Sequence, residues 1–427
     1  MSNIIRNDIL TPVSSKRTTK EKLFKICGLS AIIFALSMLV ILFTTIFSKG
    51  YSAFYQTRIK LDINFNEELI DPTGAREITT LNTADYSKLI SQSLFKFLNI
   101  DKSHPKSSEI KSLISYNSFL TLRDRVLNDP DIIGKTKKIN LIASDDVDQM
   151  LKGNINISIP EENRKITDFQ IEAIEKFKSN GNILTVFNKT LFIKSDSREP
   201  EVSGVLGAII GSFYCLFVAA CISVPIGIFA AIFLQEFAKK NKVTDFIEIN
   251  INNLAAVPSI VFGLLGLSVF INFFHLPRSS PIVGGLVLAL MSLPTIVIVT
   301  RASLLAVPDT IRNGAIALGA SKMQAIFNQV LPLATPGICT GVIIALARAL
   351  GETAPLLMIG MIAFIPDTPI AITDPATALP AQIFMWADHP ERAFVERTSA
   401  AILILLSFLI VMNAAAIYIR HKFEKKW

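Results

Sequence analysis

The stretch VSGVLGAIIGSFYCLFVAACISVPIGIFAAIFL, residues 202–234, decides the fold class because it contains no charged residue. About 20 apolar residues in a helix cross the hydrocarbon core of a bilayer, so this stretch is long enough to span a membrane. In the whole chain of 427 residues, 51% are hydrophobic and 18% are charged. Soluble domains carry about 25% charged residues, so the composition predicts a membrane protein. It excludes disordered, collagen-like and disulfide-rich chains.

Five further apolar stretches are present. The first, residues 26–47, is longer than the apolar core of about 7–15 residues in a signal peptide, and no small-x-small cleavage site follows it. We therefore expect an uncleaved membrane helix over 26–48. The other four stretches are 251–276, 281–300, 335–366 and 399–419. Together the six stretches predict an all-α polytopic membrane protein with six transmembrane helices.

A polar segment, residues 49–201, separates the first two apolar stretches. It contains 22 basic and 22 acidic residues, and about 150 residues are enough to bury a core. Alternation of polar and apolar residues predicts strands over 58–65 and 155–159, and β-branched and aromatic residues predict another over 182–193. Apolar stripes predict helices over 83–98 and 168–177. We expect an α/β domain inserted between the first two membrane helices.

Lysine and arginine residues lie mostly on one side of the predicted helices. Sixteen belong to the N-terminal segment 1–25, the loop after residue 234, the loop 301–334, and the C-terminus with its tail 421–427. The opposite side has Arg278, Arg392 and Arg397. The positive-inside rule therefore predicts that both termini are cytoplasmic. Long translocated domains are largely exempt from that rule, so the 49–201 domain is expected to be extracytoplasmic.

Enzyme and metal signatures are absent from the sequence. Four cysteines lie in apolar stretches and four histidines are scattered, which predicts neither a disulfide framework nor a metal site. No GxxxxGK[ST] motif occurs, so no nucleotide site is expected in this chain. We expect a chain that is not an enzyme and has no cofactor of its own.

The loop 301–334 is longer than a simple connection needs to be. Asp309 or Thr310 can cap a helix that Gly319 is expected to end. The apolar stripe of this helix consists of Ile311, Ala315 and Leu318. A second amphipathic helix follows, and Leu331-Pro332 returns the chain to the membrane. Such a helix suits docking into a groove of a partner and equally suits lying on the lipid surface, and the pattern does not choose.

Residues 345–355, ALARALGETAP, place two charges in the middle of the apolar stretch 335–366. Arg348 and Glu352 are four residues apart and so share a helix face. Charged side chains in a membrane helix usually face a protein interior. One interpretation is a guanidinium on a translocation path, where it binds an oxyanion by parallel hydrogen bonds while Glu352 tempers its charge or accepts a proton. The other is a structural pair that joins two helices.

Three further residues in or beside the predicted spans carry an expectation. Arg301, at the cytoplasmic end of its helix, is interpreted as a positive-inside anchor. Pro258 and Pro294 are expected to kink their helices, either as gating points or as fixed bends.

Residues 313–332 resemble the cytoplasmic loop of ABC-importer permeases, whose pattern is EAA-x3-G-x9-I-x-LP. The matching positions are Ala315, Gly319, Leu331 and Pro332. The positions that differ are Asn313, Gly314 and Gln329. Residues 254–264 (LAAVPSIVFGL), 292–297 (SLPTIV) and 345–355 are similar to the phosphate-specific permeases of these importers. The resemblance covers roughly residues 202–427 and leaves out the polar segment.

This resemblance implies a type I ABC-importer permease fold over 202–420, in a bacterial inner membrane. The implied function is that of a permease subunit of an ATP-driven inorganic phosphate importer. Substrate-path residues would be Arg348, Glu352 and Thr353. ATPase-coupling residues, within 309–332, would be Asn313, Gly314, Ala315, Gly319, Leu331 and Pro332.

The resemblance also implies partners. These are a second phosphate permease (PstC-like), a pair of ATPase subunits (PstB-like) that bind Mg-ATP, and a periplasmic phosphate-binding protein (PstS-like), with no nucleic acid. Two alternatives stay open: a permease for another oxyanion such as sulfate or molybdate, and a membrane sensor that uses the 49–201 domain.

Overall fold

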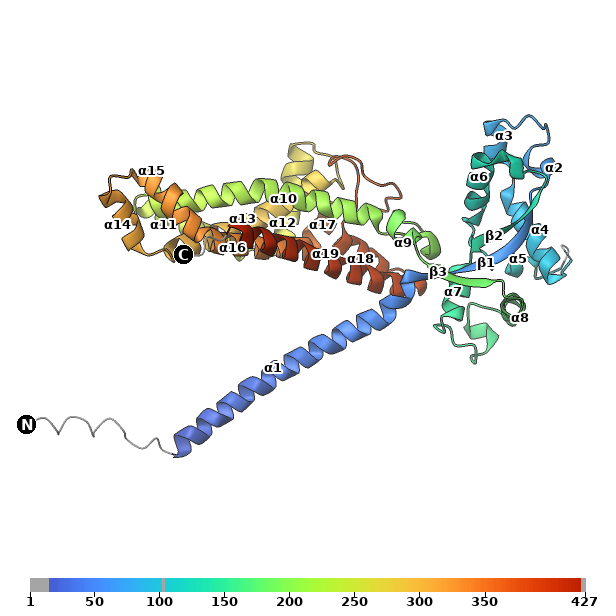
Figure 1. The fold of residues 1–427 in the computed structure, drawn as a ribbon, viewed down its shortest axis with the longest axis horizontal. Coiled ribbons are helices and arrows are strands. Elements are labelled where there is room, and N and C mark those ends of the chain that lie inside the picture. Colours follow the sequence, from blue (N-terminus) through green and yellow to red (C-terminus); the bar gives the residue numbers. More distant parts are fainter. Residues whose placement is uncertain (1–14, 102–103, 424–427) are drawn as a thin grey trace, which may run out of the picture.

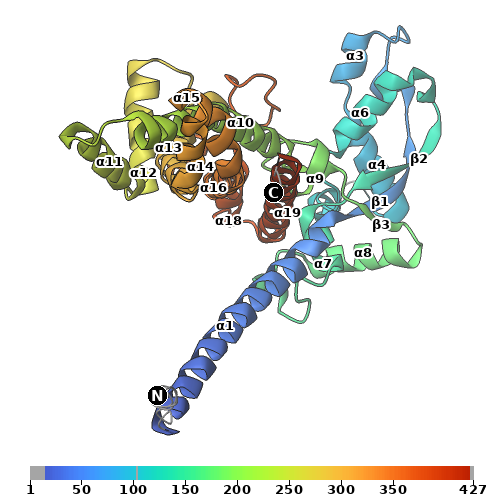
Figure 2. The ribbon, with the colours of Figure 1, turned by 60° about the vertical axis from the view of Figure 1, so that its left-hand side comes forward.

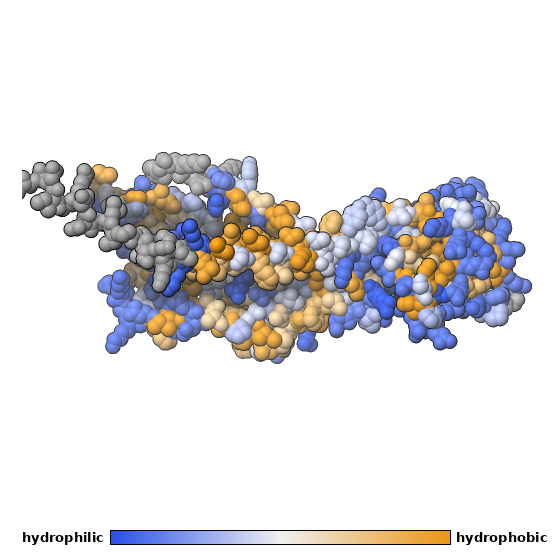
Figure 3. Space-filling model, turned by 90° about the horizontal axis from the view of Figure 1, so that it is seen from below, coloured by the Kyte–Doolittle hydropathy of each residue, from blue (hydrophilic) through white to orange (hydrophobic). Residues whose placement is uncertain are grey.

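The computed structural model describes residues 15–101 and 104–423, so parts of the predicted N-terminal segment 1–25 and tail 421–427 lie outside the described residues. A long helical part carries a smaller mixed domain at one end (Figure 1). Apolar side chains predominate along the helices, whereas the mixed domain is mostly hydrophilic (Figure 3). This division follows the composition of the chain.

The helical part is built around α10 (Leu206–Ile232), α13 (Pro281–Leu305) and α16 (Leu331–Gly351). α1 (Ser15–Gly50) diverges from it, and α19 (Ala393–Phe423) contacts both α1 and α16 (Figures 1 and 2). Over the described residues, five helices are long and apolar enough to cross a membrane, or six if one bent pair counts as a single span. That pair consists of α11 (Lys242–Ala255) and α12 (Ser259–Leu265) with the π-helical turn Gly266–Phe273.

Glycines let the central helices approach closely. A Cβ atom added to Gly285 of α13 would lie 2.5 Å from the Cβ of Val218 on α10. One added to Gly341 of α16 would lie 2.1 Å from a methyl group of Val299 on α13. Lipid tails are as apolar as the helices, so close van der Waals packing of this kind drives helix association in a bilayer.

The mixed domain contains a three-stranded antiparallel sheet of order β2-β1-β3. Its strands are β1 (Tyr55–Asn64), β2 (Thr136–Ile142) and β3 (Ile183–Phe187). The alternation along β1 buries Ile59, Leu61 and Ile63, which form a core together with apolar side chains from the surrounding helices. The longest of these helices are α4 (Tyr86–Leu98), α6 (Ser118–Asn128) and α8 (Asp168–Ser179).

Several shorter elements complete the domain. They are a 3-10 turn (Tyr51–Phe54), α2 (Glu67–Ile70), α3 (Ile78–Thr83), α5 (Ser107–Lys111), α7 (Asp145–Leu151) and α9 (Thr190–Ile193).

Most of the predicted elements of this domain are confirmed. β1 confirms the strand over 58–65, and α4 and α8 confirm the two helices. β3 confirms the first half of 182–193, but the prediction for the second half is wrong, because α9 forms there. The predicted strand over 155–159 is wrong. Its residues form turns in which the Asn156 side chain accepts a hydrogen bond from the Ser158 amide at 2.9 Å, and Ile157 and Ile159 are exposed.

The kink predicted at Pro258 is confirmed. The chain bends by 103° between α11 and the helix that begins with α12, and Pro258 is the N-cap of α12 at that bend. Pro294 lies inside α13, which continues past it. The stretch 335–366 does not form one long helix, since α16 ends at Gly351 and the short α17 (Ala354–Met358) follows. Arg348 and Glu352 therefore lie at the end of a helix, not in its middle.

A substitution of Gly285 by leucine tests the glycine contact between α10 and α13. We expect Gly285→Leu to lower the free energy of unfolding by about 1–3 kcal/mol, because the new side chain has no space beside Val218. Gly28→Leu on α1 is the matched control, since no atom lies within 4 Å of a Cβ built there. Thermal unfolding in detergent measures both, and equal melting temperatures for the two variants would contradict this packing.

Candidate functional site

The loop predicted to contact a partner lies at the end of the helical part remote from the mixed domain (Figures 1 and 2). It contains α14 (Asp309–Ala317) and α15 (Lys322–Ala325), and a π-helical turn (Ile326–Val330) leads into α16. Gly319 has φ +88°, a conformation that favours glycine, and it confirms that the first helix ends there. The Ser321 side chain caps α15 in a reciprocal capping box with Gln324.

Part of the apolar stripe of α14 is half-buried, and part is exposed. Ile311 and Ala315 are half-buried, and Ile311 packs against a cluster of buried apolar residues from α10, α13 and α16. Leu318 instead is 92% exposed, and Ile316 and Met323 are 49% and 56% exposed. The outer surface of the loop is therefore apolar, and Asn313 and Gly314 lie exposed on it. Leu331 and Pro332, at the start of α16, are half-buried.

A buried ion pair fixes α14 to the end of α10. The Arg312 guanidinium donates to the Glu236 carboxylate at 2.9 Å, with the side chains 16% and 7% exposed. It also donates to the Leu304 and Val307 carbonyls, each at 2.6 Å. This pair was not foreseen, although Glu236 is the first charge after the stretch 202–234. Such a multiply bonded guanidinium holds α14 in one orientation.

Arg301 makes a similar link. Its guanidinium donates to the Glu248 carboxylate at 2.7 Å and so joins α13 to α11. The side chain is thus engaged in a contact between helices of the chain.

The structure brings Arg348, Glu352 and Thr353 together where α16 ends. Glu352 is the C-cap of α16 and Thr353 is the N-cap of α17. Arg348 Nε lies 3.5 Å from a Glu352 carboxylate oxygen, with the side chains 61% and 20% exposed. This is a loose contact, so the guanidinium remains accessible to another acceptor.

Arg348 belongs to an exposed face of α16. Ile344 and Gly351 lie on that face, whereas Ala345 and Ala349 are buried against the rest of the chain. An arginine on an outward face of a membrane helix is costly next to lipid, so this face is expected to border a second protein or an aqueous path.

Comparison with known proteins shows the family of the chain. Residues 223–426 match the family described as binding-protein-dependent transport system inner membrane component. The probable ABC transporter permease protein YqgI of Bacillus subtilis is 32% identical over 238 residues, which cover 52% of this chain and 80% of the relative. The chain belongs to this family of ABC transporter permeases. It is thus an integral, multi-pass inner-membrane protein and a transport subunit.

Two other relatives carry a more specific name. The phosphate transport system permease protein PstA of Haemophilus influenzae is 31% identical over 234 residues, covering 54% of this chain and 81% of the relative. PstA 1 of Mycobacterium tuberculosis is 34% identical over 224 residues, covering 52% and 72%. Residues 13–161 of the permease match a separate family described as a domain of unknown function (DUF3333).

Removing the charge of Glu236 tests the link between α14 and α10. We expect Glu236→Gln to speed amide hydrogen exchange in residues 309–325 by about tenfold, because the Arg312 guanidinium loses its buried carboxylate partner. Asp309→Asn is the control, since Asp309 also pairs with Arg312 but is 87% exposed and such surface pairs contribute about 0–1 kcal/mol. Unchanged exchange in Glu236→Gln would show that α14 does not depend on this pair.

Proposed function

We propose that the permease is the translocation subunit of an ATP-driven importer of inorganic phosphate. The observation that carries this proposal is the identity of 31–34% to PstA proteins over about half of the chain and most of the relatives' length. The exposed guanidinium of Arg348 supplies the matching chemistry, because arginine binds tetrahedral oxyanions through parallel hydrogen bonds.

The proposed topology has six spans, with α11 and α12 together forming one broken span. Both termini are cytoplasmic and the mixed domain is extracytoplasmic. The arrangement in Figure 1 supports this, because the domain and the basic loop with α14 lie at opposite ends of the helices. Outside the mixed domain, whose 22 basic residues are balanced by 22 acidic ones, 16 lysine and arginine residues belong to the segments predicted to be cytoplasmic and three to the opposite side, in agreement with the positive-inside rule.

Arg348, Glu352 and Thr353 form the proposed substrate path. The guanidinium binds phosphate, and Glu352 moderates its charge or accepts a proton from the protonated anion. A second, PstC-like permease would cover the exposed face of α16 and complete the path. Pro258, at the bend between α11 and α12, and Pro294, inside α13, are the proposed gating points.

The outer surface of α14 and α15 is the proposed contact with a PstB-like ATPase pair, which binds Mg-ATP. Its exposed apolar side chains suit a groove on a partner. The proposed coupling residues are Asn313, Gly314, Ala315, Gly319, Leu331 and Pro332. A PstS-like phosphate-binding protein would deliver substrate at the opposite face.

Phosphate uptake tests the substrate. Membrane vesicles would contain the permease with its candidate permease partner, ATPase and binding protein, and would receive labelled phosphate with sulfate or molybdate as competitor. We expect ATP-dependent uptake that neither competitor inhibits. Inhibition by sulfate or molybdate would favour another oxyanion. No uptake by an assembled complex, together with ligand binding by the mixed domain, would favour a sensor.

Substitution of Arg348 tests its contact with substrate. We expect Arg348→Gln to lower the uptake rate at limiting phosphate by about tenfold or more, because a charge-assisted hydrogen bond contributes about 1.5–3 kcal/mol. Arg348→Lys keeps the charge and should retain part of the activity. Equal uptake by wild type and Arg348→Gln would make the residue structural.

Substitution of Gly319 tests the coupling loop. We expect Gly319→Ala to reduce ATP-dependent uptake while membrane insertion stays normal, since a left-handed conformation costs a non-glycine residue about 1–2 kcal/mol. Gly134→Ala is the matched control, because Gly134 also has a left-handed conformation (φ +81°) with no atom within 4 Å of an added Cβ, but it lies in the mixed domain. Normal uptake in Gly319→Ala would argue against coupling through this turn.

A further inference from the structure

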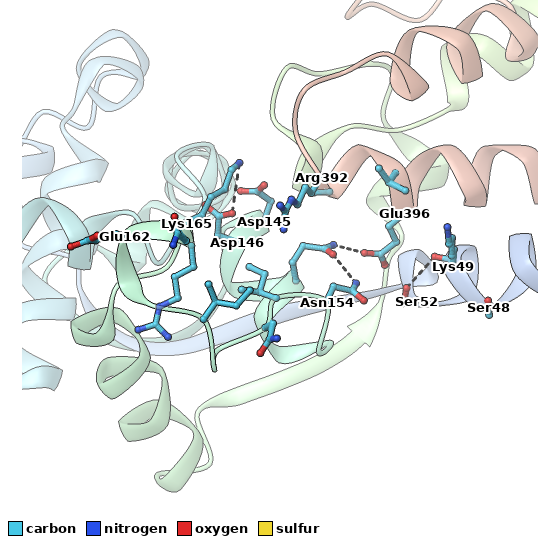
Figure 4. Close-up of a pocket in the computed structure, with 18 residues that line it drawn as sticks. Ser48, Lys49, Ser52, Asp145, Asp146, Asn154, Glu162, Lys165, Arg392 and Glu396 are labelled. Atoms are coloured by element: carbon cyan, nitrogen blue, oxygen red, sulfur yellow. Dashed lines mark hydrogen bonds and ion pairs between the residues drawn. The ribbon is translucent and has the colours of Figure 1, made fainter.

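A polar cavity of about 630 Å³ lies where the mixed domain meets the adjoining ends of α1 and α19 (Figure 4). This volume is typical of sites for small molecules, which measure about 300–1,000 Å³. The cavity is lined from three directions: by Lys49 at the end of α1, by Asp145 and Asp146 at the start of α7, and by Arg392 and Glu396 around the start of α19. The proposed phosphate path does not use any of these residues.

The charged and polar groups beneath the cavity are paired with one another. The Lys152 ammonium lies 2.7 Å from both the Asp148 and the Glu396 carboxylates, and these three side chains are at most 14% exposed. The Gln149 amide group donates to Glu396 and accepts from the Asn154 amide group. These groups need no ligand, and they make the floor a fixed surface.

The remaining charges are separated along the cavity. Figure 4 shows Lys49 and Ser48 at one end and Asp145, Asp146 and Lys165 at the other. Cations also line this part of the cavity: the Lys165 ammonium lies 3.9 Å from Asp146 and is 53% exposed, and Arg392 contributes a guanidinium. Burial, followed by the charge of Asp145, raises the pKa of Asp146.

Two further carboxylates, Glu199 and Glu391, do not line the cavity but interact electrostatically with Asp145 or Asp146. Burial raises the pKa of Glu199, with smaller contributions from the charges of Glu391 and Asp145. Several carboxylates therefore influence one another here, and a cationic group entering the cavity would relieve their repulsion.

The end of the cavity at Lys49 continues into a groove between two membrane-spanning helices. This groove has a volume of about 250 Å³ and shares Lys49 and Val395 with the cavity. Its other lining residues are Thr45, Ile46, Ala387, Thr398 and Ser399. α1 and α19 touch at Gly50, where an added Cβ would lie 2.9 Å from the Ser399 carbonyl carbon. Beside this contact the groove is open to the lipid that surrounds α1.

We propose that the cavity binds the headgroup of a phospholipid with a primary ammonium group, while one acyl chain lies in the groove between α1 and α19. The ammonium lies at Asp145 and Asp146, and the long, flexible Lys49 side chain extends along the cavity to bind the phosphate. The order of sites from the membrane outward is apolar groove, cation, carboxylates. This is the order of acyl chain, phosphate and ammonium in such a lipid. The lipid thereby joins the mixed domain to both helices.

A headgroup series tests the proposal without changing the protein. The full chain is reconstituted in phosphatidylglycerol with equal amounts of phosphatidylethanolamine, its monomethyl and dimethyl derivatives, or phosphatidylcholine. It is then transferred to mild detergent, and native mass spectrometry measures the retained lipid. These four lipids share a phosphate and differ in the number of N–H donors. We expect retention to fall along the series, by about tenfold from first to last, as charge-assisted hydrogen bonds are lost.

Equal retention of the four lipids, or preferential retention of phosphatidylglycerol, would overturn the proposal. The first result would mean that no carboxylate binds the ammonium group of the lipid. The second would mean that the cavity takes an anion at its cations alone.

Two variants locate the site. We expect Asp145→Asn with Asp146→Asn to abolish the preference for phosphatidylethanolamine, and Lys49→Gln to lower retention of all four lipids. Asp129→Asn with Asp131→Asn is the matched control, because these acids lie on the same domain and are 53% and 77% exposed. If the variant with Asp145→Asn and Asp146→Asn still prefers phosphatidylethanolamine, the lipid binds elsewhere. If that variant does not fold, as judged by gel filtration, the headgroup series on the wild-type chain still decides.

Discussion

Close contact between α10, α13 and α16 is the constraint on which the functional regions depend. Glycines at the contact points leave no space for a Cβ, so the helices have little freedom to slide past one another. α16 begins at the proposed coupling loop and ends at Arg348 and Glu352. Its 21 residues extend over about 30 Å at 1.5 Å per residue. A movement of the loop would therefore be transmitted to the candidate path by α16 alone, which packs against α10 and α13.

The local pattern predicted the elements whose apolar residues recur at a regular spacing. Strict alternation identified β1, and the place of Gly319 after an apolar stripe identified the end of α14. The turns over 155–159 alternate in the same way, but they pair with no strand, and Asn156 closes a turn with its own side chain. β2 (Thr136–Ile142) was missed because Lys137 and Lys138 interrupt its alternation, and β1 supplies the pairing that makes it a strand.

The candidate site shows the same limit. The spacing of Arg348 and Glu352 correctly predicted that they are neighbours. It did not predict that the helix ends there, although Pro355 has no N–H to donate to the Gly351 carbonyl and so disfavours a helix that continues through it. The pair of Glu236 and Arg312 joins residues 76 positions apart, and no periodicity connects such positions. Contacts of this kind depend on how helices pack, which a single sequence does not specify.

The ion pairs beneath the cavity have a mechanical consequence. Lys152 bridges the domain to Glu396, and Arg397 donates to the Ser203 carbonyl at 2.7 Å. The Trp386 indole also donates to Asp196 at 3.0 Å, so α18 (Leu379–Ala387) is tied to the same junction. These bonds fix the orientation of the mixed domain on α19 and α18. A rotation of α19 would therefore displace the whole domain, and α3, at the far end of the domain in Figure 1, would move farther than the residues at the junction.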